Sequence, residues 1–318
     1  MFKTFQAFMR RSSTYSKNSK YLTTKKSTSS NQIWKRPIPK FPVYQKAPES
    51  DISDALKTLK TQVNNGEDIS LETYFNSNHF QFKEGTEESS LALLKDYMTL
   101  VQSGRPLVAI DCESYEWKHN CITEIGISIL KNNSKTSIIP EIETIHVVVN
   151  EYFNMRNSKY VPDKKDFFMG GTSHVLSETN ARLLLQKVLN KYINQQDGIL
   201  VGHQVSAELS YFSSIGVQYK PDVKILDTMK IQRISRFGGN SLWATLKMLQ
   251  IPYGYLHNAG NDAYFTLLAA LSLCDPKVRI NKNLDIYSDS PYKGIKAQHH
   301  DKAEYFLVED VDSIVNNL

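Results

Sequence analysis

Two acidic side chains follow the most hydrophobic stretch of the chain. Asp111 and Glu113 come directly after the apolar run LVAI at 107–110. Side chains alternate between the two faces of a strand, so both carboxylates should point to one face and Cys112 to the other. Adjacent carboxylates repel each other unless a cation lies between them, and such hard oxygen ligands suit Mg²⁺ or Mn²⁺. The pair therefore predicts a divalent-metal site at the end of a buried strand.

Three further residues could complete this site. Glu208 lies in VGHQVSAELSYF, where the short strand GILV passes into a helix, and is expected early in that helix. His257 precedes Asp262 by five positions in LHNAGNDAYFTLLAAL. Asp262 is expected in the first turn of a helix that starts near Asn261, where the helix dipole favours an anion. Taken alone, Glu208 reads as a solvated helix residue and His257 as a surface residue of a loop.

Together these positions offer four carboxylates and one imidazole on separate elements of one domain. Acids that converge from a central strand and two helices can hold two Mg²⁺ ions about 4 Å apart, which clamp the attacking and leaving oxygens of a phosphodiester. A neutral histidine nearby can take the proton of the attacking water. The chemistry implied is metal-assisted phosphodiester hydrolysis.

The elements that must position these residues form an α/β pattern. Three β-rich runs come first, at 105–117, 121–130 and 143–150. The elements expected after them are helix 177–196, strand 198–204, helix 207–216, strand 223–229, and helices 241–251 and 261–274. A meander followed by crossovers predicts a mixed sheet flanked by helices.

Further segments lie on either side of this domain, which spans 105–275. Amphipathic helices at 51–63 and 87–104 predict an N-terminal helical extension over 49–104 that packs on the domain. Residues 276–318 are polar and predict a partly ordered surface tail. If a protein partner binds, we expect it at the extension or at this tail.

Charge is unevenly distributed along the chain. Residues 1–48 hold eleven Lys or Arg and no Asp or Glu, which leaves 27 basic and 33 acidic residues, a net charge of −6, for the other 270. The first 30 residues are also rich in Ser and Thr, a composition typical of a mitochondrial transit peptide, and 31–48 contains four of the eleven prolines and predicts a linker. We expect the mitochondrial matrix; the alternative is a basic tail on a cytoplasmic or nuclear protein.

Composition excludes several classes of protein. Apolar residues make up 41% of the chain and aromatic residues 11%, which excludes a wholly disordered protein. No apolar run approaches the roughly 20 residues of a membrane-spanning helix. Three cysteines without a CxxC pair exclude a disulfide scaffold and a thiolate zinc knuckle. No GxGxxG follows a strand and no GxxxxGK[ST] is present, which excludes a dinucleotide-dependent dehydrogenase and a P-loop ATPase.

Four motifs in this order resemble the DEDD superfamily of 3′-5′ exonucleases, in the DEDDh branch that has a histidine five residues before its last Asp. They are LVAIDCES, VGHQVSAEL, ILDTMK and LHNAGNDAYFTLLAAL. The last motif, together with FFMGGTSHVLS at 167–177, is similar to the fungal good-for-full-DEAD-box-helicase-activity-like proteins. The resemblance covers about residues 105–275.

The resemblance implies a ribonuclease H-like fold and a set of site residues. Metal ligands would be Asp111, Glu113 and Asp262, and His257 would be the general base. Glu208 stands where the family usually carries Asp, and completes the expected set of four metal-binding acids. Glu adds one methylene, and metal sites tolerate little displacement of a ligand.

Two functions follow from these expectations. The first is a metal-dependent 3′-5′ exonuclease that uses two Mg²⁺ or Mn²⁺ ions to hydrolyse RNA or single-stranded DNA from the 3′ end. The alternative is a catalytically impaired ribonuclease H-like domain that binds nucleic acid or acts as a protein adaptor. The sequence does not distinguish RNA from DNA as the substrate.

Overall fold

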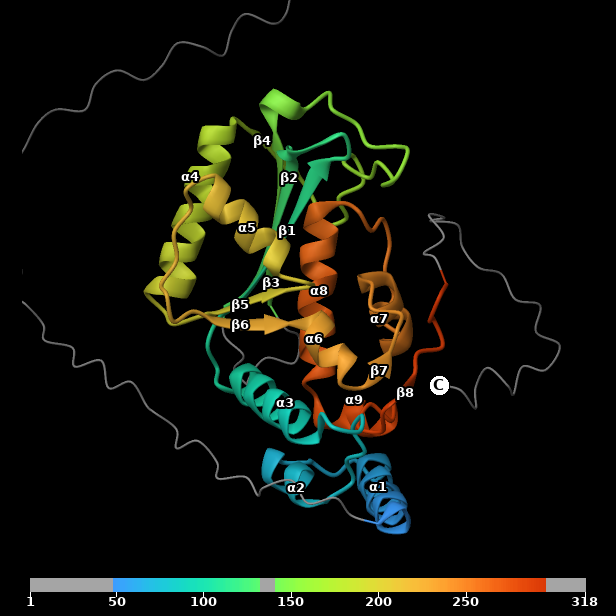
Figure 1. The fold of residues 1–318 in the computed structure, drawn as a ribbon. Helices are drawn as coiled ribbons and strands as arrows, with labels where there is room; N and C mark the ends of the chain where they lie inside the picture. The colour runs from blue at the N-terminus through green and yellow to red at the C-terminus, as the bar shows by residue number, and fades with distance from the viewer. Residues whose placement is uncertain (1–47, 132–140, 296–318) are drawn as a thin grey trace, which may run out of the picture. The chain divides into compact units, whose positions relative to one another are not determined.

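The computed structural model describes residues 48–131 and 141–295 (Figure 1). These residues belong to one compact unit, Ile38–Leu318. Apart from Pro48, the predicted leader and linker over 1–48 lie outside the described residues, as does 296–318, so the transit peptide stays a prediction. Within the described part, no helix combines the length and the apolar character needed to cross a membrane.

A mixed sheet of six strands forms the centre of the fold, in the order β4-β3-β2-β1-β5-β6. Its strands are β1 (Leu107–Tyr115), β2 (Lys118–Leu130), β3 (Ile142–Val149), β4 (Ser173–Leu176), β5 (Ile199–Gly202) and β6 (Lys224–Asp227). The first three strands form an antiparallel meander, and β5 and β6 continue from β1 in parallel. The predicted meander and crossovers are confirmed. Strand β4, which pairs in parallel with β3, was not predicted.

Helices lie on both faces of this sheet, and others lie beyond it at the bottom of the view in Figure 1, where α1 and α2 lie below α3. The helices of the described residues are α1 (Glu49–Asn64), α2 (Leu71–Asn76), α3 (Glu87–Gln102), α4 (Glu178–Val188), α5 (Ser206–Ser214), α6 (Thr228–Arg233), α7 (Leu242–Leu249), α8 (Ala259–Leu273) and α9 (Pro276–Asn281). A 3₁₀ turn, η1 (Asn150–Tyr152), follows β3, and a π-helical turn, η2 (Leu189–Asn194), follows α4. A second, two-stranded sheet pairs β7 (Arg236–Phe237) with β8 (Ser288–Asp289).

Alternating side chains of β1 divide the core into two layers. Leu107 and Ala109 pack in a layer with α3, α7 and α8. Val108 and Ile110 pack on the other side of the sheet with α4 and α5. Side chains two positions apart on a strand share a face. Residues further along β1 therefore face the same helices as the residues two positions before them.

The ends of several predicted elements differ from those in the structure by two or three residues. The predicted strand 223–229 ends at Asp227, whose Oδ1 accepts a hydrogen bond from the backbone N–H of Met229 (3.0 Å). That bond caps α6, so the chain becomes helical two residues earlier than the apolar pattern indicated. The predicted helix 177–196 is α4 continued through the π-helical turn η2, which wraps one extra residue into the turn.

The segment after α8 is folded against the N-terminal extension. Arg279 on α9 is fully buried (0% exposed). Its Nε donates to Asp285 Oδ1 (2.8 Å) and to the hydroxyl of Tyr74 on α2 (2.9 Å). The prediction of a surface tail is therefore wrong for residues 276–295, because the burial of Arg279 depends on partners that are distant in sequence.

The carboxylate of Asp285 compensates the buried positive charge of Arg279. Burial alone would raise its pKa, but Arg279, together with His79, whose Nε2 lies 2.8 Å from Asp285 Oδ2, outweighs that effect and holds the pKa well below its ordinary range. Breaking a buried pair by removing one partner leaves the other charge uncompensated.

We expect Asp285→Asn to lower the free energy of unfolding at pH 7 by about 3–5 kcal/mol, the range for a broken buried pair. The folded-state pKa is depressed, so the stabilisation is complete above the unfolded pKa, near 3.9, and is lost as pH falls through the folded pKa. Urea unfolding of both proteins should therefore show a difference that shrinks below about pH 4.

Asp289→Asn is the matched control. Asp289 pairs with Lys293 at the surface, and 70% of its side chain is exposed. Its replacement should change the free energy of unfolding by less than about 1 kcal/mol. Equal effects of the two substitutions would contradict a structural role for the buried pair.

Candidate active site

Strand β1 carries Asp111 and Glu113 to the face of the sheet that α8 covers. Alternate positions of a strand share a face, so both side chains point to the same face as Leu107 and Ala109. Leu107 and Ala109 pack in the core layer that contains α8. The pairing of β1 with β2 becomes irregular just after Glu113. Such irregularities re-aim side chains at the end of a strand. The two carboxylates therefore point toward the N-terminal end of α8.

The start of α8 is held against β2 at very short range. A Cβ added to Gly126 would lie 1.8 Å from the carbonyl oxygen of Ala259, so only glycine allows this approach. Asn258 caps the helix through its Oδ1, which accepts the backbone N–H of Asn261 (3.1 Å). The helix thus begins at Ala259, two residues before the predicted start at 261. Asp262 stays in its first turn, as expected.

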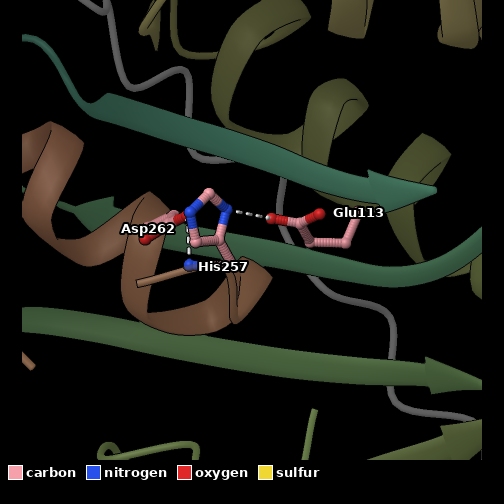
Figure 2. Close-up of side chains that lie close together, drawn as sticks. All are labelled: Glu113, His257 and Asp262. Atoms are coloured by element: carbon pink, nitrogen blue, oxygen red, sulfur yellow. Dashed lines mark hydrogen bonds and ion pairs between the residues drawn. The ribbon is translucent and has the colours of Figure 1, made fainter. Parts of the chain in front are cut away.

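Glu113, His257 and Asp262 form one compact group, with one donor atom from each lying within 4.8 Å of the others. Figure 2 shows the imidazole beside both carboxylates. His257 Nδ1 is 3.7 Å from Glu113 Oε1, and the backbone N–H of His257 donates to Asp262 Oδ2 (3.0 Å). His257 has a φ of +70°, a conformation that side chains with a Cβ rarely adopt. The hydrogen bond to Asp262 helps to hold this turn.

The carboxylates of the compact group raise the pKa of Asp111 and of Glu208. Burial raises the pKa of Asp111 well above its ordinary value, and the carboxylates of Asp262, Glu113, Glu208 and Glu124 raise it further. Four neighbouring acids therefore act on one carboxyl group. Without a cation, the cluster must hold protons to relieve this repulsion.

Glu208 reaches the cluster from the first turn of α5. Only 8% of the residue is exposed. Burial raises the pKa of Glu208 to about 7; a hydrogen bond from its own backbone opposes this, and Asp227 and Glu113 raise the pKa by smaller amounts. Burial and Glu113 likewise raise the pKa of Asp262, although His257 partly offsets this.

Two of these carboxylates carry an oxygen that lacks a hydrogen-bond partner within the described part of the chain. They are Glu208 Oε2 and Asp262 Oδ1, both buried. A buried polar atom without a partner is destabilising unless an unseen ligand satisfies it. Unsatisfied carboxylate oxygens in an acid-rich cluster fit a divalent cation, which prefers such hard donors.

The structure thus places the five predicted residues in one neighbourhood, with a difference in detail. Glu113 and Asp262 meet His257, which was predicted as a base and also lies among the possible ligand atoms. Asp111 and Glu208 are outside that compact group. The roles assigned to the five residues remain predictions.

A line of polar residues behind the site was not predicted. His146 on β3 is fully buried, and its Nε2 lies 2.9 Å from Glu124 Oε2 on β2 while its Nδ1 lies 2.7 Å from Ser173 Oγ on β4. Glu124 Oε2 also accepts the backbone N–H of Ala259 (3.3 Å). The line therefore supports the start of α8. The available signal was one titratable residue inside each of two apolar runs, Glu124 in CITEIGISIL and His146 in IHVVV.

Comparison with known proteins gives a family match over the domain. Residues 106–273 match the model of the DEDDh_C family, described as DNA polymerase III subunit epsilon-like, C-terminal domain. "Good for full DBP5 activity protein 2" of Saccharomyces cerevisiae is 33% identical over 232 residues, which cover 63% of this chain and 41% of that protein. A nucleolar protein of Schizosaccharomyces pombe is 32% identical over 168 residues, 50% of this chain and 65% of that protein. The chain therefore matches less than two thirds of the length of each relative.

Among solved structures, exonuclease I is similar with a TM-score of 0.36 and 12% sequence identity. The superposition covers 57% of this chain and 42% of that chain.

We expect the site to bind Mn²⁺ and Asp262→Asn to weaken that binding by at least about 10-fold, because it removes a charged donor from the compact group. Calorimetric titration of Mn²⁺ into both proteins measures this difference. Glu143→Gln is the control, since Glu143 is an exposed acid on β3 that pairs with Lys131. Equal affinities of wild type and Asp262→Asn would contradict the site.

Proposed function

This chain belongs to the DEDDh family of DNA polymerase III subunit epsilon-like C-terminal domains, and from that premise we propose that it is a metal-dependent 3′-5′ exonuclease that acts on RNA or single-stranded DNA. The observation that carries the proposal is the convergence of Glu113, His257 and Asp262 within 4.8 Å. The fold is consistent with it, since the six-stranded mixed sheet flanked by helices is the ribonuclease H-like exonuclease fold that the resemblance implied. The similarity to the budding-yeast relative supports the predicted fungal branch.

The residues present fit a divalent cation. Glu113 and Asp262 would hold it, and Asp111 and Glu208 would add negative charge to its surroundings. A bound Mg²⁺ or Mn²⁺ supplies stabilisation of the negative charge that develops on the phosphate. Glu208 and Asp262 are buried, so this stabilisation would act in surroundings of low dielectric, where it is strong.

His257 is placed to handle the proton of the attacking water. Its ring is partly exposed (37% of the side chain), so substrate can approach it. Nδ1 faces the carboxylate of Glu113 at 3.7 Å, which orients the ring and stabilises the imidazolium formed when the base takes a proton.

Glu208 is the residue that favours the second candidate, a domain that keeps the fold and binds without cutting. It lies outside the compact group, and it is longer by one methylene than the Asp usual in the family. A metal ligand held in a shifted position loosens the geometry that hydrolysis needs. The name of the yeast relative refers to the activity of another protein, which agrees with such an adaptor role.

We expect wild-type protein to shorten 5′-labelled single strands from the 3′ end in Mg²⁺ or Mn²⁺, and not in EDTA. His257→Ala should lower the rate by about 10²-fold or more if the imidazole is the base. Glu208→Asp should raise the rate, because it restores the shorter carboxylate. RNA and DNA oligomers of the same sequence, followed on denaturing gels, measure these rates and reveal the preferred sugar.

The outcomes separate the two candidates. Cutting by Glu208→Asp but not by wild type would support the adaptor. Absence of cutting in all three proteins, with circular dichroism showing the fold intact, would remove the exonuclease proposal.

We also propose that the protein resides in the mitochondrial matrix, on the strength of the eleven basic and no acidic residues in 1–48. Residues 1–40 fused to a fluorescent reporter should direct it to mitochondria. A diffuse cytoplasmic or nuclear signal would overturn this proposal and favour the alternative compartments.

A further inference from the structure

Two groups of aromatic rings at the surface, each with a lysine over them, join the segment that follows η1 to other parts of the chain: the turn between β1 and β2, and the loop before α8. The hairpin cluster consists of Trp117, Lys159 and Tyr160. Trp117 is 57% exposed and Tyr160 62% exposed, and their ring centroids are 5.6 Å apart. The ammonium of Lys159 lies 4.9 Å from the indole centroid and 5.0 Å from the phenol centroid. Because the two rings adjoin, they form a contiguous exposed patch, the kind of surface found at interaction sites.

The hairpin cluster is held rigidly despite its exposure. The carboxylate of Glu116, next to Trp117, accepts the backbone N–H groups of residues 158–161 at 2.8–3.2 Å. Burial would raise the pKa of Glu116, but these four donors outweigh it and lower the pKa to about 2. Asn157 adds two bonds, accepting from the backbone N–H of Glu116 and donating to the carbonyl of Ser114, both at 2.9 Å. The rings are therefore preorganised, which lowers the entropy lost when a ligand binds.

The helix cluster consists of Lys164, Phe167 and Tyr255. Phe167 is 47% exposed and stacks on Tyr255 with a centroid distance of 5.0 Å and an interplanar angle of 19°. The ammonium of Lys164 lies 5.4 Å and 5.8 Å from the two ring centroids.

The helix cluster is fastened beside the candidate active site. Asn261 Nδ2 donates to the carbonyls of Phe167 (2.9 Å) and Tyr255 (3.1 Å). Asn261 precedes Asp262 in α8, and Tyr255 lies two residues before His257. The segment 157–169 thus runs from the end of β1, which carries Glu113, to the start of α8.

The charges of this segment suit a polyanion. Its acids Asp163 and Asp166 both pair with Arg156, which neutralises part of their field. Lys159 and Lys164 each stand over aromatic rings at the surface. Nucleobases stack on aromatic faces, and lysines attract the phosphates between them, so rings and lysines together form a surface typical of single-strand binding.

We propose that the hairpin cluster and the helix cluster bind single-stranded nucleic acid and lead its 3′ end to Glu113, His257 and Asp262. The location of the reacting end rests on the proposed function, whereas the binding surface rests on the rings and lysines themselves. Bases in a duplex are already stacked on one another, so this surface should prefer single strands to duplexes.

The test measures binding without cutting. Fluorescence anisotropy of 5′-fluorescein oligo(dT) and oligo(U), and of a blunt duplex, is followed in EDTA with the full chain. We expect wild type to bind the single strands more tightly than the duplex, and Trp117→Ala and Phe167→Ala each to weaken binding by at least about 5-fold, the loss of one stacked base. Trp117→Phe should largely restore affinity, because a ring is retained. Lys159→Gln should reduce the dependence of the binding affinity on salt concentration by the amount expected for the loss of about one phosphate contact.

Phe237→Ala is the matched control. Phe237 is 48% exposed and carries the ammonium of Lys293 4.2 Å from its ring, but it lies on β7, in the second sheet. Phe237→Ala should bind the single strands with the same affinity as wild type. Unchanged affinity in both Trp117→Ala and Phe167→Ala, equal loss in Phe237→Ala, or no binding by wild type would each overturn the inference.

Failure of the proposed function has a different signature. Single strands that bind through the two clusters but are not cut in Mg²⁺ or Mn²⁺ leave the binding surface in place and remove the exonuclease. Cutting that persists while the cluster variants bind normally removes the surface and leaves the exonuclease.

Discussion

The approach of α8 to β2 at Gly126 is the contact on which the candidate site depends. The space for a Cβ at this position is filled by the carbonyl of Ala259, 1.8 Å from where that atom would lie. Overpacking such a contact shifts backbone, because protein interiors are close-packed and not compressible. His257 and Asp262 lie immediately before and just inside the same helix start. Any displacement of α8 would therefore move both away from Glu113, which belongs to a different element.

Buried charged groups are arranged in opposite ways around Arg279 and at the candidate active site. Around Arg279 the charges are opposite in sign and fully hydrogen-bonded, so burial strengthens their attraction. At the site the charges are alike, and two carboxylate oxygens have no partner among the described residues. A cluster of like charges is destabilising in the absence of a cation, and the surrounding core must offset it. Glu124 and His146 contribute by tying the start of α8 to the sheet.

Much of this arrangement follows from local sequence pattern, and the rest from contacts between distant residues. Strict alternation along 107–113 was enough to place Asp111 and Glu113 on one face. The link between Glu124, His146 and Ser173 needs three neighbouring strands in a defined register, which no single segment specifies. The same holds for Arg279, whose partners come from α2 and from the loop after α9. The start of α6 was misplaced for a local reason, because capping by Asp227 overrides the apolar run.

Glu208 is an acid of the candidate site whose surroundings oppose its ionisation. At the first turn of α5 the helix dipole favours its anion, but burial, Asp227 and Glu113 oppose ionisation and raise its pKa to about 7. A carboxyl group with that pKa is about half protonated near neutral pH, and it must release its proton before it can bind a cation. Protons therefore compete with metal at Glu208. An acid at this position can act as a metal ligand in a nuclease only when the metal binds strongly enough to displace the proton. The strength of metal binding depends in turn on how well Glu113, Asp262 and Asp111 already hold the ion.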